Sequence, residues 1–557
     1  MKTVICLLFV ISFSVSAQTN EQIQSFGGEF FAWRALSQPA TGDDIPRVER
    51  PDGWTPDFSP EALIRYRKAY RRFHDGLEAI PRNGWTRADS VDYLLLRSAV
   101  ERVNWELNLL RLPNRNPDFY VHQTLGAVYE LLLIASPMTD VRARNIVARV
   151  KSIPATLEHA RVNLTEPVEP FADIALEKLQ GVGERLSQMA EGLKGSMAKS
   201  YHRELDEAVR RASAALEGFA GWIEREKPSM TREFSVGREG YSYFLKNIAL
   251  VPLSPEELLL MGNLEWNRSV AFDVYEQARD ANVVRPKLFA SADDQIQQSR
   301  KDEESIRKFL EEKNIMTVPG WVHHYGNRKL PDELAPLAGM GVTDDLTSET
   351  RLDEDGVSYI PDPSPNLPFF SLASAEDPRP LIVHEGIPGH YFQLVRSWAN
   401  PDPIRRHYFD SGPNEGIGFY VEELMLQFGL FDDRPHTREI IYRFMRLRAL
   451  RVDVDVNLAL GSTTIDEAGK YLASTVPMDL ETGVGEARFF AYNPGQAISY
   501  QVGKLQILKL IADAKIQRGD EFSLQDYHDY MMVNGNVPIA LQRWEYLGLD
   551  DEARRLW

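Results

Sequence analysis

The sequence predicts a mainly α-helical fold with a small β-sheet, and three observations lead to this class. Apolar residues recur at spacings of three and four through most of the 557-residue chain, which is the period of amphipathic helices. Residues typical of helix starts precede several of these segments. Glycine and proline gather in one stretch, 315–380, where short apolar runs are typical of strands and loops.

Capping residues mark where helices begin. Ser59-Pro60-Glu61 combines an N-cap with a proline at the first helical position, and Thr86 followed by Asp89 has the spacing of a capping box. Ser254-Pro255-Glu256-Glu257 marks a third start. We expect further helices over 139–163, 173–193, 200–225, 254–280 and 293–313, and helical structure again from 380 nearly to Trp557.

The stretch 315–380 separates two helical blocks and contains two predicted strands, Val357 to Ile360 and Phe369 to Leu372. A chain of this length exceeds what one small core organises, so we expect at least two packed subdomains. The predicted division is a signal peptide (1–17), an N-terminal helical subdomain (18–315) and a C-terminal subdomain with the small sheet (316–557).

Composition and charge exclude several classes of protein. Hydrophobic residues make up 43% of the chain and charged residues 26%, which excludes a largely disordered protein. Lys and Arg number 63 against 81 Asp and Glu, and no basic block is visible. Because binding to nucleic acid of any sequence needs a cationic surface, we expect no nucleic-acid partner.

The first residues have the pattern of a secretory signal. Lys2 precedes an apolar run from Val4 to Val15, and Ala17 provides a small residue before a cleavage at Gln18. We therefore expect export to the periplasm or the extracellular space. Cys6, the only cysteine, lies too early within the apolar run for a lipid-modified cysteine, so a lipid-anchored form is not expected. No other run of about twenty apolar residues appears, which predicts no stable membrane insertion.

A metal-binding motif begins the second helical block. The run from His384 to His390 reads His-Glu-Gly-Ile-Pro-Gly-His, and it resembles a zinc hydrolase motif in which the two histidines stand four residues apart. Here they are six apart, which rotates them by about 240° on an ideal helix. Pro388 and Gly389 favour a distorted turn that brings both imidazoles together. The alternative is a structural histidine pair at a kinked helix start.

A later helix supplies the third predicted ligand. Glu415 lies 25 residues beyond His390, an interval that suits a carboxylate arriving from the next helix. Glu422, seven residues on, lies on the same helical face and can orient an imidazole, although an exposed position is an open alternative. Glu423 points about 80° away and is expected in solvent. Gly416 and Gly418 would allow this helix to approach its neighbour closely.

These residues match a known family pattern, His-Glu-x-x-Pro-Gly-His-x-x-Gln followed by Glu-Gly, an aromatic residue and a second Glu. The matching positions are His384, Glu385, Pro388, Gly389, His390, Gln393, Glu415, Gly416, Tyr420 and Glu422. Further landmarks are Arg451 to Asp455, Glu486 to Arg488 and Pro494 to Lys504. The chain thus resembles the bacterial family catalogued as domain of unknown function 885, over at least 240–557.

The resemblance implies a multi-helix, gluzincin- or neurolysin-like architecture around a deep cleft, with the metal at its floor beside the small sheet. It implies no substrate. Two departures from the family pattern stand out. Ala459 occupies a position where relatives often have a histidine, and Ile417-Gly418 replaces the usual Trp-Ala, which is expected to change the pocket wall.

A mechanism follows from the predicted parts. One Zn²⁺ held by His384, His390 and Glu415 would lower the pKa of a bound water to about 7, with Glu385 as general base and Gln393 and Glu422 as supporting residues. Attack on a carbonyl group forms an oxyanion that needs a hydrogen-bond donor, and the candidate donors are Tyr492, Tyr500, Arg488 and His407. Tyr492 and Arg488 are preferred because they lie just before the Pro494-Gly495-Gln496 turn. Similar helical peptidases also have a tyrosine late in the chain.

Three functions remain open at this stage. The first is an exported zinc metallopeptidase acting on short or unfolded peptides, with 316–557 as its catalytic subdomain. The second is a metallohydrolase of a non-peptide amide or ester. The third is a non-catalytic helical protein that binds metal or ligand, which is disfavoured because Glu385 has no structural reason to follow His384.

Overall fold

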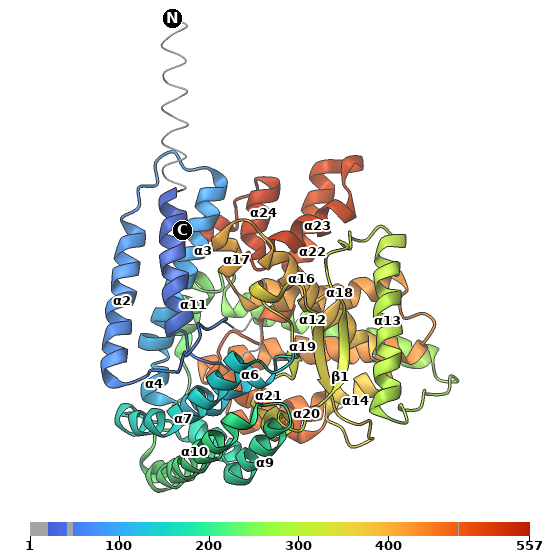
Figure 1. Cartoon of the computed structure of the whole chain (residues 1–557). Coiled ribbons are helices and arrows are strands. Elements are labelled where there is room, and N and C mark those ends of the chain that lie inside the picture. Colours follow the sequence, from blue (N-terminus) through green and yellow to red (C-terminus); the bar gives the residue numbers. More distant parts are fainter. Residues whose placement is uncertain (1–20, 42–47, 477, 557) are drawn as a thin grey trace, which may run out of the picture.

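A computed structural model of the whole chain describes residues 21–41, 48–476 and 478–556 (Figure 1). The predicted signal peptide, 1–17, lies outside these residues. The first half is helical, with residues 21–37 in a helix. It continues with α2 (Pro60–Glu78), α3 (Arg87–Asn104), η1 (Trp105–Leu109), α4 (Leu112–Arg115), α5 (Pro117–Val121), η2 (His122–Gly126), α6 (Ala127–Leu132), α7 (Asp140–Asn163), α8 (Glu169–Lys178), α9 (Val182–Lys194), α10 (Lys199–Glu226), η3 (Lys227–Ser229), α11 (Gly237–Asn247), α12 (Pro255–Arg279) and α13 (Ala292–Glu312).

The second half begins with short strands and then returns to helices. In order these are β1 (Tyr325–Lys329), η4 (Ala335–Met340), β2 (Asp344–Asp345), η5 (Glu349–Arg351), β3 (Gly356–Ile360), α14 (Phe369–Glu376), α15 (Arg379–Leu381), η6 (Ile382–Gly386), α16 (His390–Trp398), α17 (Pro403–His407), α18 (Ser411–Phe428), α19 (Pro435–Leu460), α20 (Ile465–Thr475), α21 (Leu480–Tyr492), α22 (Ser499–Arg518), η7 (Gly519–Glu521), α23 (Leu524–Asn534), α24 (Ile539–Leu547) and η8 (Ala553–Arg555).

The predicted helix starts are confirmed. The Ser59 hydroxyl caps α2, and complete capping boxes begin α3 at Thr86 and α12 at Ser254. The prediction of one continuous helix over 173–193 is wrong. The segment contains parts of α8 and α9, which are separated at Gly181, whose φ of 60° ends regular helical geometry.

The predicted small sheet is present, with strand order β1-β3-β2. β1 pairs in parallel with β3, Tyr325 opposite Gly356, and β2 pairs antiparallel with β3. The predicted strand over Phe369 to Leu372 is wrong, because this run begins α14. Its aromatic side chains pack against Phe444 of α19, so tertiary contacts decide its conformation.

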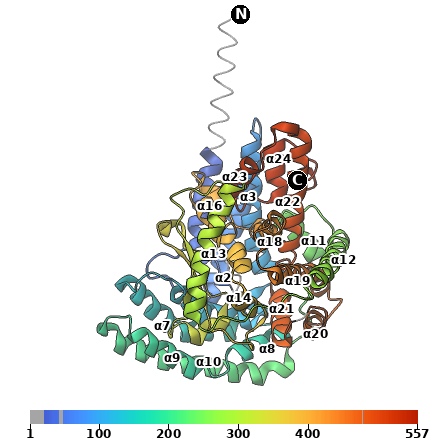
Figure 2. The same ribbon diagram turned by 90° about the vertical axis from the view of Figure 1, so that its right-hand side faces the viewer.

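The helices enclose apolar clusters that draw on distant parts of the chain. The largest combines residues of both predicted subdomains, such as Leu96, Leu216, Val357 and Leu541. A second cluster, formed by η6, α16, α18 and α19 among others, packs against the sheet strand β1. In Figures 1 and 2, α9 and α10 lie at the base and α22 to α24 at the opposite end. Within the described ranges, no helix combines the length and apolar character needed to cross a membrane.

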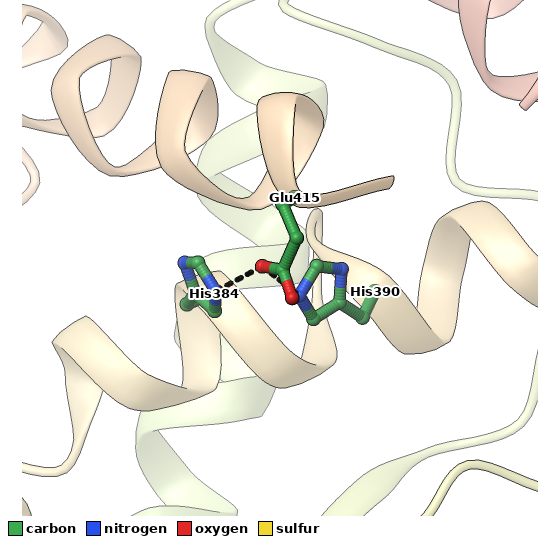
Figure 3. A group of neighbouring side chains, drawn as sticks. All are labelled: His384, His390 and Glu415. Carbon is green, nitrogen blue, oxygen red and sulfur yellow. Dashed lines mark ion pairs between the residues drawn. The ribbon is translucent and has the colours of Figure 1, made fainter. Parts of the chain in front are cut away.

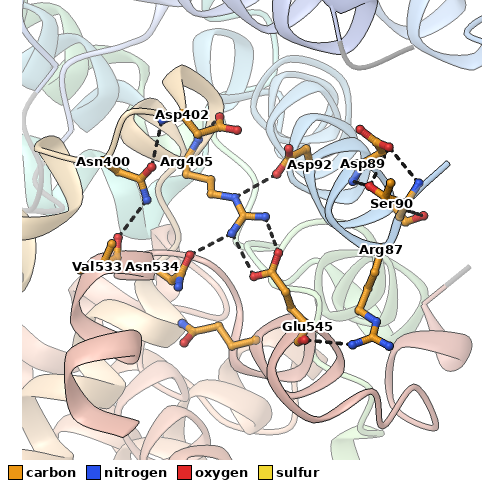
Figure 4. A network of polar contacts seen from close by, with 12 residues as sticks. Arg87, Asp89, Ser90, Asp92, Asn400, Asp402, Arg405, Val533, Asn534 and Glu545 are labelled. Atoms are coloured by element: carbon orange, nitrogen blue, oxygen red, sulfur yellow. Dashed lines mark hydrogen bonds and ion pairs between the residues drawn. The ribbon is translucent and has the colours of Figure 1, made fainter. Parts of the chain in front are cut away.

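A partly buried polar network joins four helices that are far apart in the sequence (Figure 4). Arg405 of α17 donates to Asp92 of α3 at 3.1 Å, to Asn534 of α23 at 2.8 Å and to both carboxylate oxygens of Glu545 of α24 at 2.9 and 2.6 Å. Burial raises the pKa of Asp92 to about 7 against the opposing effect of Arg405. Folding therefore places this carboxyl where its ionised form is costly.

Candidate metal centre

The two histidines of the motif lie on separate helical segments. His384 belongs to the π-helical turn η6, and α16 begins at His390. Between them Ile387 is extended, with φ −127° and ψ 127°. A Cβ at Gly389 would lie 1.8 Å from the carbonyl oxygen of His384, so only glycine fits the break. The imidazole centroids lie 4.7 Å apart, which agrees with the expected distorted turn.

Glu415 of α18 completes a cluster of three ligand atoms (Figure 3). Its Oε2 lies 3.5 Å from Nε2 of His384 and 3.3 Å from Nε2 of His390. A tetrahedral ion with bonds of about 2.0–2.1 Å separates its ligand atoms by about 3.3–3.4 Å. Oε2 is also buried without a hydrogen-bond partner. The donor set and its spacing therefore fit a divalent ion such as Zn²⁺.

The charges around the cluster also favour a cation. Burial and Arg448 lower the pKa of His384, but the carboxylates of Glu385, Glu415 and Glu422 outweigh them and raise it to about 9. Three carboxylates therefore surround one imidazole, opposed by Arg448 and, at Glu415, by Arg451. A divalent ion would offset this excess of negative charge.

Two glycines allow α18 to approach its neighbours. A Cβ at Gly418 would lie 2.8 Å from Cε1 of His384 and 2.9 Å from Cε1 of His390, so the glycine lets both rings lie against α18. A Cβ at Gly416 would lie 2.6 Å from the Cα of Gly503 on α22. The close approach expected from these glycines is confirmed.

Glu422 orients the first imidazole. Its Oε1 lies 2.7 Å from Nδ1 of His384, and Arg448 of α19 holds the same carboxylate at 2.8 and 3.1 Å. Because Nδ1 is engaged, Nε2 is the atom that faces the cluster. Glu422 is fully buried, so the exposed alternative is wrong. The expectation for Glu423 is also wrong, since it pairs with two cations on α12 and α22, Arg268 and Lys504.

Gln393 supports the site indirectly. This fully buried side chain on α16 accepts a hydrogen bond from Asn414 Nδ2 at 2.7 Å and donates to Asn536 at 3.3 Å. Asn414 immediately precedes Glu415, so the contact ties the helix of His390 to the helix of the carboxylate ligand.

Glu385, the candidate general base, lies where its ionised form is disfavoured. Burial raises its pKa to about 8, with Asp344 and Glu415 adding to the increase and His384 opposing it. The sheet lies against this turn, because a Cβ at Gly386 would lie 2.3 Å from the Tyr325 ring. Sequence reasoning missed Asp344 and Tyr325, which come from β2 and β1 and have no motif.

The four candidate oxyanion donors fall in different places. Tyr500 stacks on His384 with centroids 6.3 Å apart and planes 16° apart, and burial and then Glu415 raise its pKa. Tyr492 instead lies beside His122, 6.2 Å between centroids. The other two pair elsewhere, Arg488 with Glu177 and His407 with Glu349. The contacts therefore favour Tyr500 over the preferred pair Tyr492 and Arg488.

A cavity of about 490 Å³ lies apart from the ligand cluster. Aromatic side chains line much of it, including Phe30, Trp105, Trp398 and Tyr408, and Tyr492 and His407 also contribute. None of the three ligands is among its lining residues. The deep cleft with the metal at its floor therefore stays a prediction.

Of the departures from the family pattern, Ala459 and Ile417 are buried among apolar side chains, whereas Gly418 faces the two imidazoles. Their positions add no polar group to the ligand cluster, and Ile417 follows Gly416 on the buried face of α18.

Comparisons with known proteins place the chain in a family. The model of the family described as "Bacterial protein of unknown function (DUF885)" matches residues 39–544. A solved structure titled as a "putative lipoprotein of unknown function" from Shewanella oneidensis is 18% identical, with a TM-score of 0.71 over 94% of this chain and 99% of that one. A "putative lipoprotein" from Colwellia psychrerythraea is 17% identical, with a TM-score of 0.74 over 97% and 98%. No curated protein matches the chain. At these identities the two solved structures show a shared fold alone. The family match spans most of the sequence, and the chain therefore belongs to the bacterial DUF885 family.

Proposed function

We propose that this protein is an exported zinc-dependent hydrolase, a gluzincin-like metallopeptidase that cleaves short or unfolded peptides. One observation carries the proposal: Nε2 of His384, Nε2 of His390 and Oε2 of Glu415 converge at 3.3–3.5 Å from carboxylate to nitrogen. Two imidazoles and one carboxylate form the ligand set of a catalytic zinc site with an open position.

A bound Zn²⁺ would supply Lewis acidity and lower the pKa of a coordinated water to about 7. Glu385 follows His384 directly, and its side chain is partly exposed, so it can accept a proton from an attacking water. The same carboxyl can later donate that proton to the leaving amine.

Other residues of the chain hold this arrangement in place. The Glu422 and Arg448 pair fixes the orientation of His384. Tyr500, stacked on the same imidazole, is the proposed hydrogen-bond donor to the oxyanion that forms when a carbonyl is attacked.

The proposed location is the periplasm or the extracellular space. The predicted signal supports export, and both solved structures with the same fold carry the words "putative lipoprotein" in their titles. Those titles keep a lipid-anchored form open, with Cys6 as the only cysteine to carry a lipid. Mass spectrometry of the exported protein distinguishes cleavage before Gln18 from a lipid-modified Cys6.

Replacing Glu385 with Gln tests the function. The substitution keeps all three ligands and removes the basic group, so hydrolysis should fall about 10²-fold or more while zinc content and melting temperature stay unchanged. Peptide mixtures and panels of non-peptide amides and esters, digested side by side, separate a peptidase from another metallohydrolase. Unchanged turnover in Glu385→Gln on a substrate that the parent cleaves would contradict the mechanism, and a zinc-loaded parent that cleaves none of them would favour a binding protein.

A further inference from the structure

A second group of buried metal-binding side chains lies where α12 ends and α19 begins. Asp280 is the C-cap of α12, and His436 and Glu439 belong to the first turns of α19. One potential ligand atom from each residue lies within 4.8 Å of the other two, and all three residues are buried. His436 and Glu439 stand three residues apart, which places both on one face of the helix.

The hydrogen bonds of His436 fix which ring nitrogen faces the group. Nε2 lies 3.0 Å from the carbonyl oxygen of Val283, and a carbonyl only accepts, so Nε2 carries a hydrogen. Histidines that bind metals commonly donate their other ring N–H to a backbone carbonyl in this way. Nδ1 then faces the Oε1 of Glu439 at 2.7 Å, which is a hydrogen-bond distance, so a proton lies between the two atoms unless a cation binds and displaces it.

Asp280 decides between a proton and a cation. It is 3% exposed, and its Oδ2 is buried without a hydrogen-bond partner. Among the ion pairs within 4.0 Å in the described ranges, none includes Asp280, whereas Arg285 reaches Glu439 at 2.5 Å. A proton on Nδ1 would therefore satisfy Glu439 and leave Asp280 without a counter-charge. A cation between the three side chains would contact all of them.

We propose that Asp280, His436 and Glu439 bind a divalent transition-metal ion, Zn²⁺ or Mn²⁺, that holds the end of α12 to the start of α19. One imidazole and two carboxylates suit these ions. Positive charge at the C-terminus of α12 also interacts favourably with the helix dipole. The proposal concerns structure and does not rest on the proposed hydrolase.

Metal counting tests the second site. Protein stripped with a chelator is titrated with Zn²⁺ and, separately, with Mn²⁺ in a calorimeter, and bound metal is confirmed by elemental analysis. The wild type should bind two ions. His390→Ala, which removes a ligand of the first cluster, and the double variant Asp280→Asn with His436→Asn should each bind one. The exposed Asp293→Asn is the matched control and should bind two.

The outcomes separate this proposal from the proposed function. If His390→Ala binds as many ions as the wild type while the double variant loses one, the first cluster fails and the second stands. If the double variant keeps the wild-type count, the second site is refuted. A folding defect in the double variant leaves His390→Ala informative, because metal at about 100 times its Kd should raise the melting temperature of that variant by about 2 °C. If titration of His390→Ala with either metal gives no heat of binding and no rise in melting temperature, the second site is also refuted.

Discussion

Replacing Gly416 with alanine tests how closely α18 must pack for the metal site to exist. The added Cβ would lie 2.6 Å from the Cα of Gly503, whereas carbon atoms in contact prefer about 3.5–4.0 Å. The helices must therefore separate by about 1 Å. Glu415 precedes Gly416 and moves with it, and metal sites tolerate displacements of only about 0.2 Å. We expect Zn²⁺ affinity to fall at least tenfold and the free energy of unfolding to fall by about 1–3 kcal/mol.

The sign of the stability change makes this prediction informative. In an unobstructed helix, alanine is more stable than glycine by about 0.5–1 kcal/mol. Gly485 of α21 is the matched control, because a Cβ there meets no atom within 4 Å. Gly485→Ala should therefore keep its metal and unfold at the same or a higher denaturant concentration. Urea unfolding and zinc titration of both variants measure the effects. Equal zinc affinity and higher stability in Gly416→Ala would refute the reasoning.

Three further predictions concern separate parts of the chain. Glu422→Gln should weaken zinc binding by about 10–100-fold, as measured by competition with a chelator, because His384 loses its orienting carboxylate. Tyr500→Phe should lower kcat on any identified substrate by about 10²–10³ with metal content unchanged, and equal losses in Tyr492→Phe would contradict the assignment. Burial raises the pKa of Asp92 to about 7 from its usual 3.8. The stability that its protonated form provides is therefore present below about pH 4 and is lost as the pH rises through about 7. Urea unfolding midpoints measured across about pH 4–8 should decline less in Asp92→Asn than in the wild type.

Local chemistry explains which helices could be predicted from the sequence. Thr86 with Asp89 and Ser254 with Glu257 satisfy backbone N–H groups within four residues, and both helix starts are confirmed. The run at Phe369 has the composition of a strand but begins α14, because contacts with α19 over 70 residues away determine its conformation. Periodicity also hid the break at Gly181, which a glycine permits without interrupting the apolar pattern on either side.

Some features of the candidate site could likewise be predicted from the local sequence, whereas others depend on the fold. The proximity of His384, His390 and Glu415 could be predicted because these residues belong to two short motifs with a family pattern. The position of Tyr500 against His384 could not be predicted, since this stacking depends on how α22 crosses α18. Asp280 and His436 lie over 150 residues apart and belong to no motif, so only the fold brings them together.

The spacing along α18 shows how one helix can organise the proposed metal centre. The proposed ligand Glu415, the contact surface at Gly418 and Glu422, which contacts His384, follow at intervals of three and four, so they share one helical face. The histidines come instead from a broken segment whose geometry depends on Gly389. A regular helix tolerates conservative substitutions between its contact positions. The break between the histidines does not, because any side chain at position 389 would overlap the carbonyl oxygen of His384. Substitutions at positions 417 and 421, which point away from the ligands, should therefore affect packing more than metal binding, while a Cβ at 389 should abolish the site.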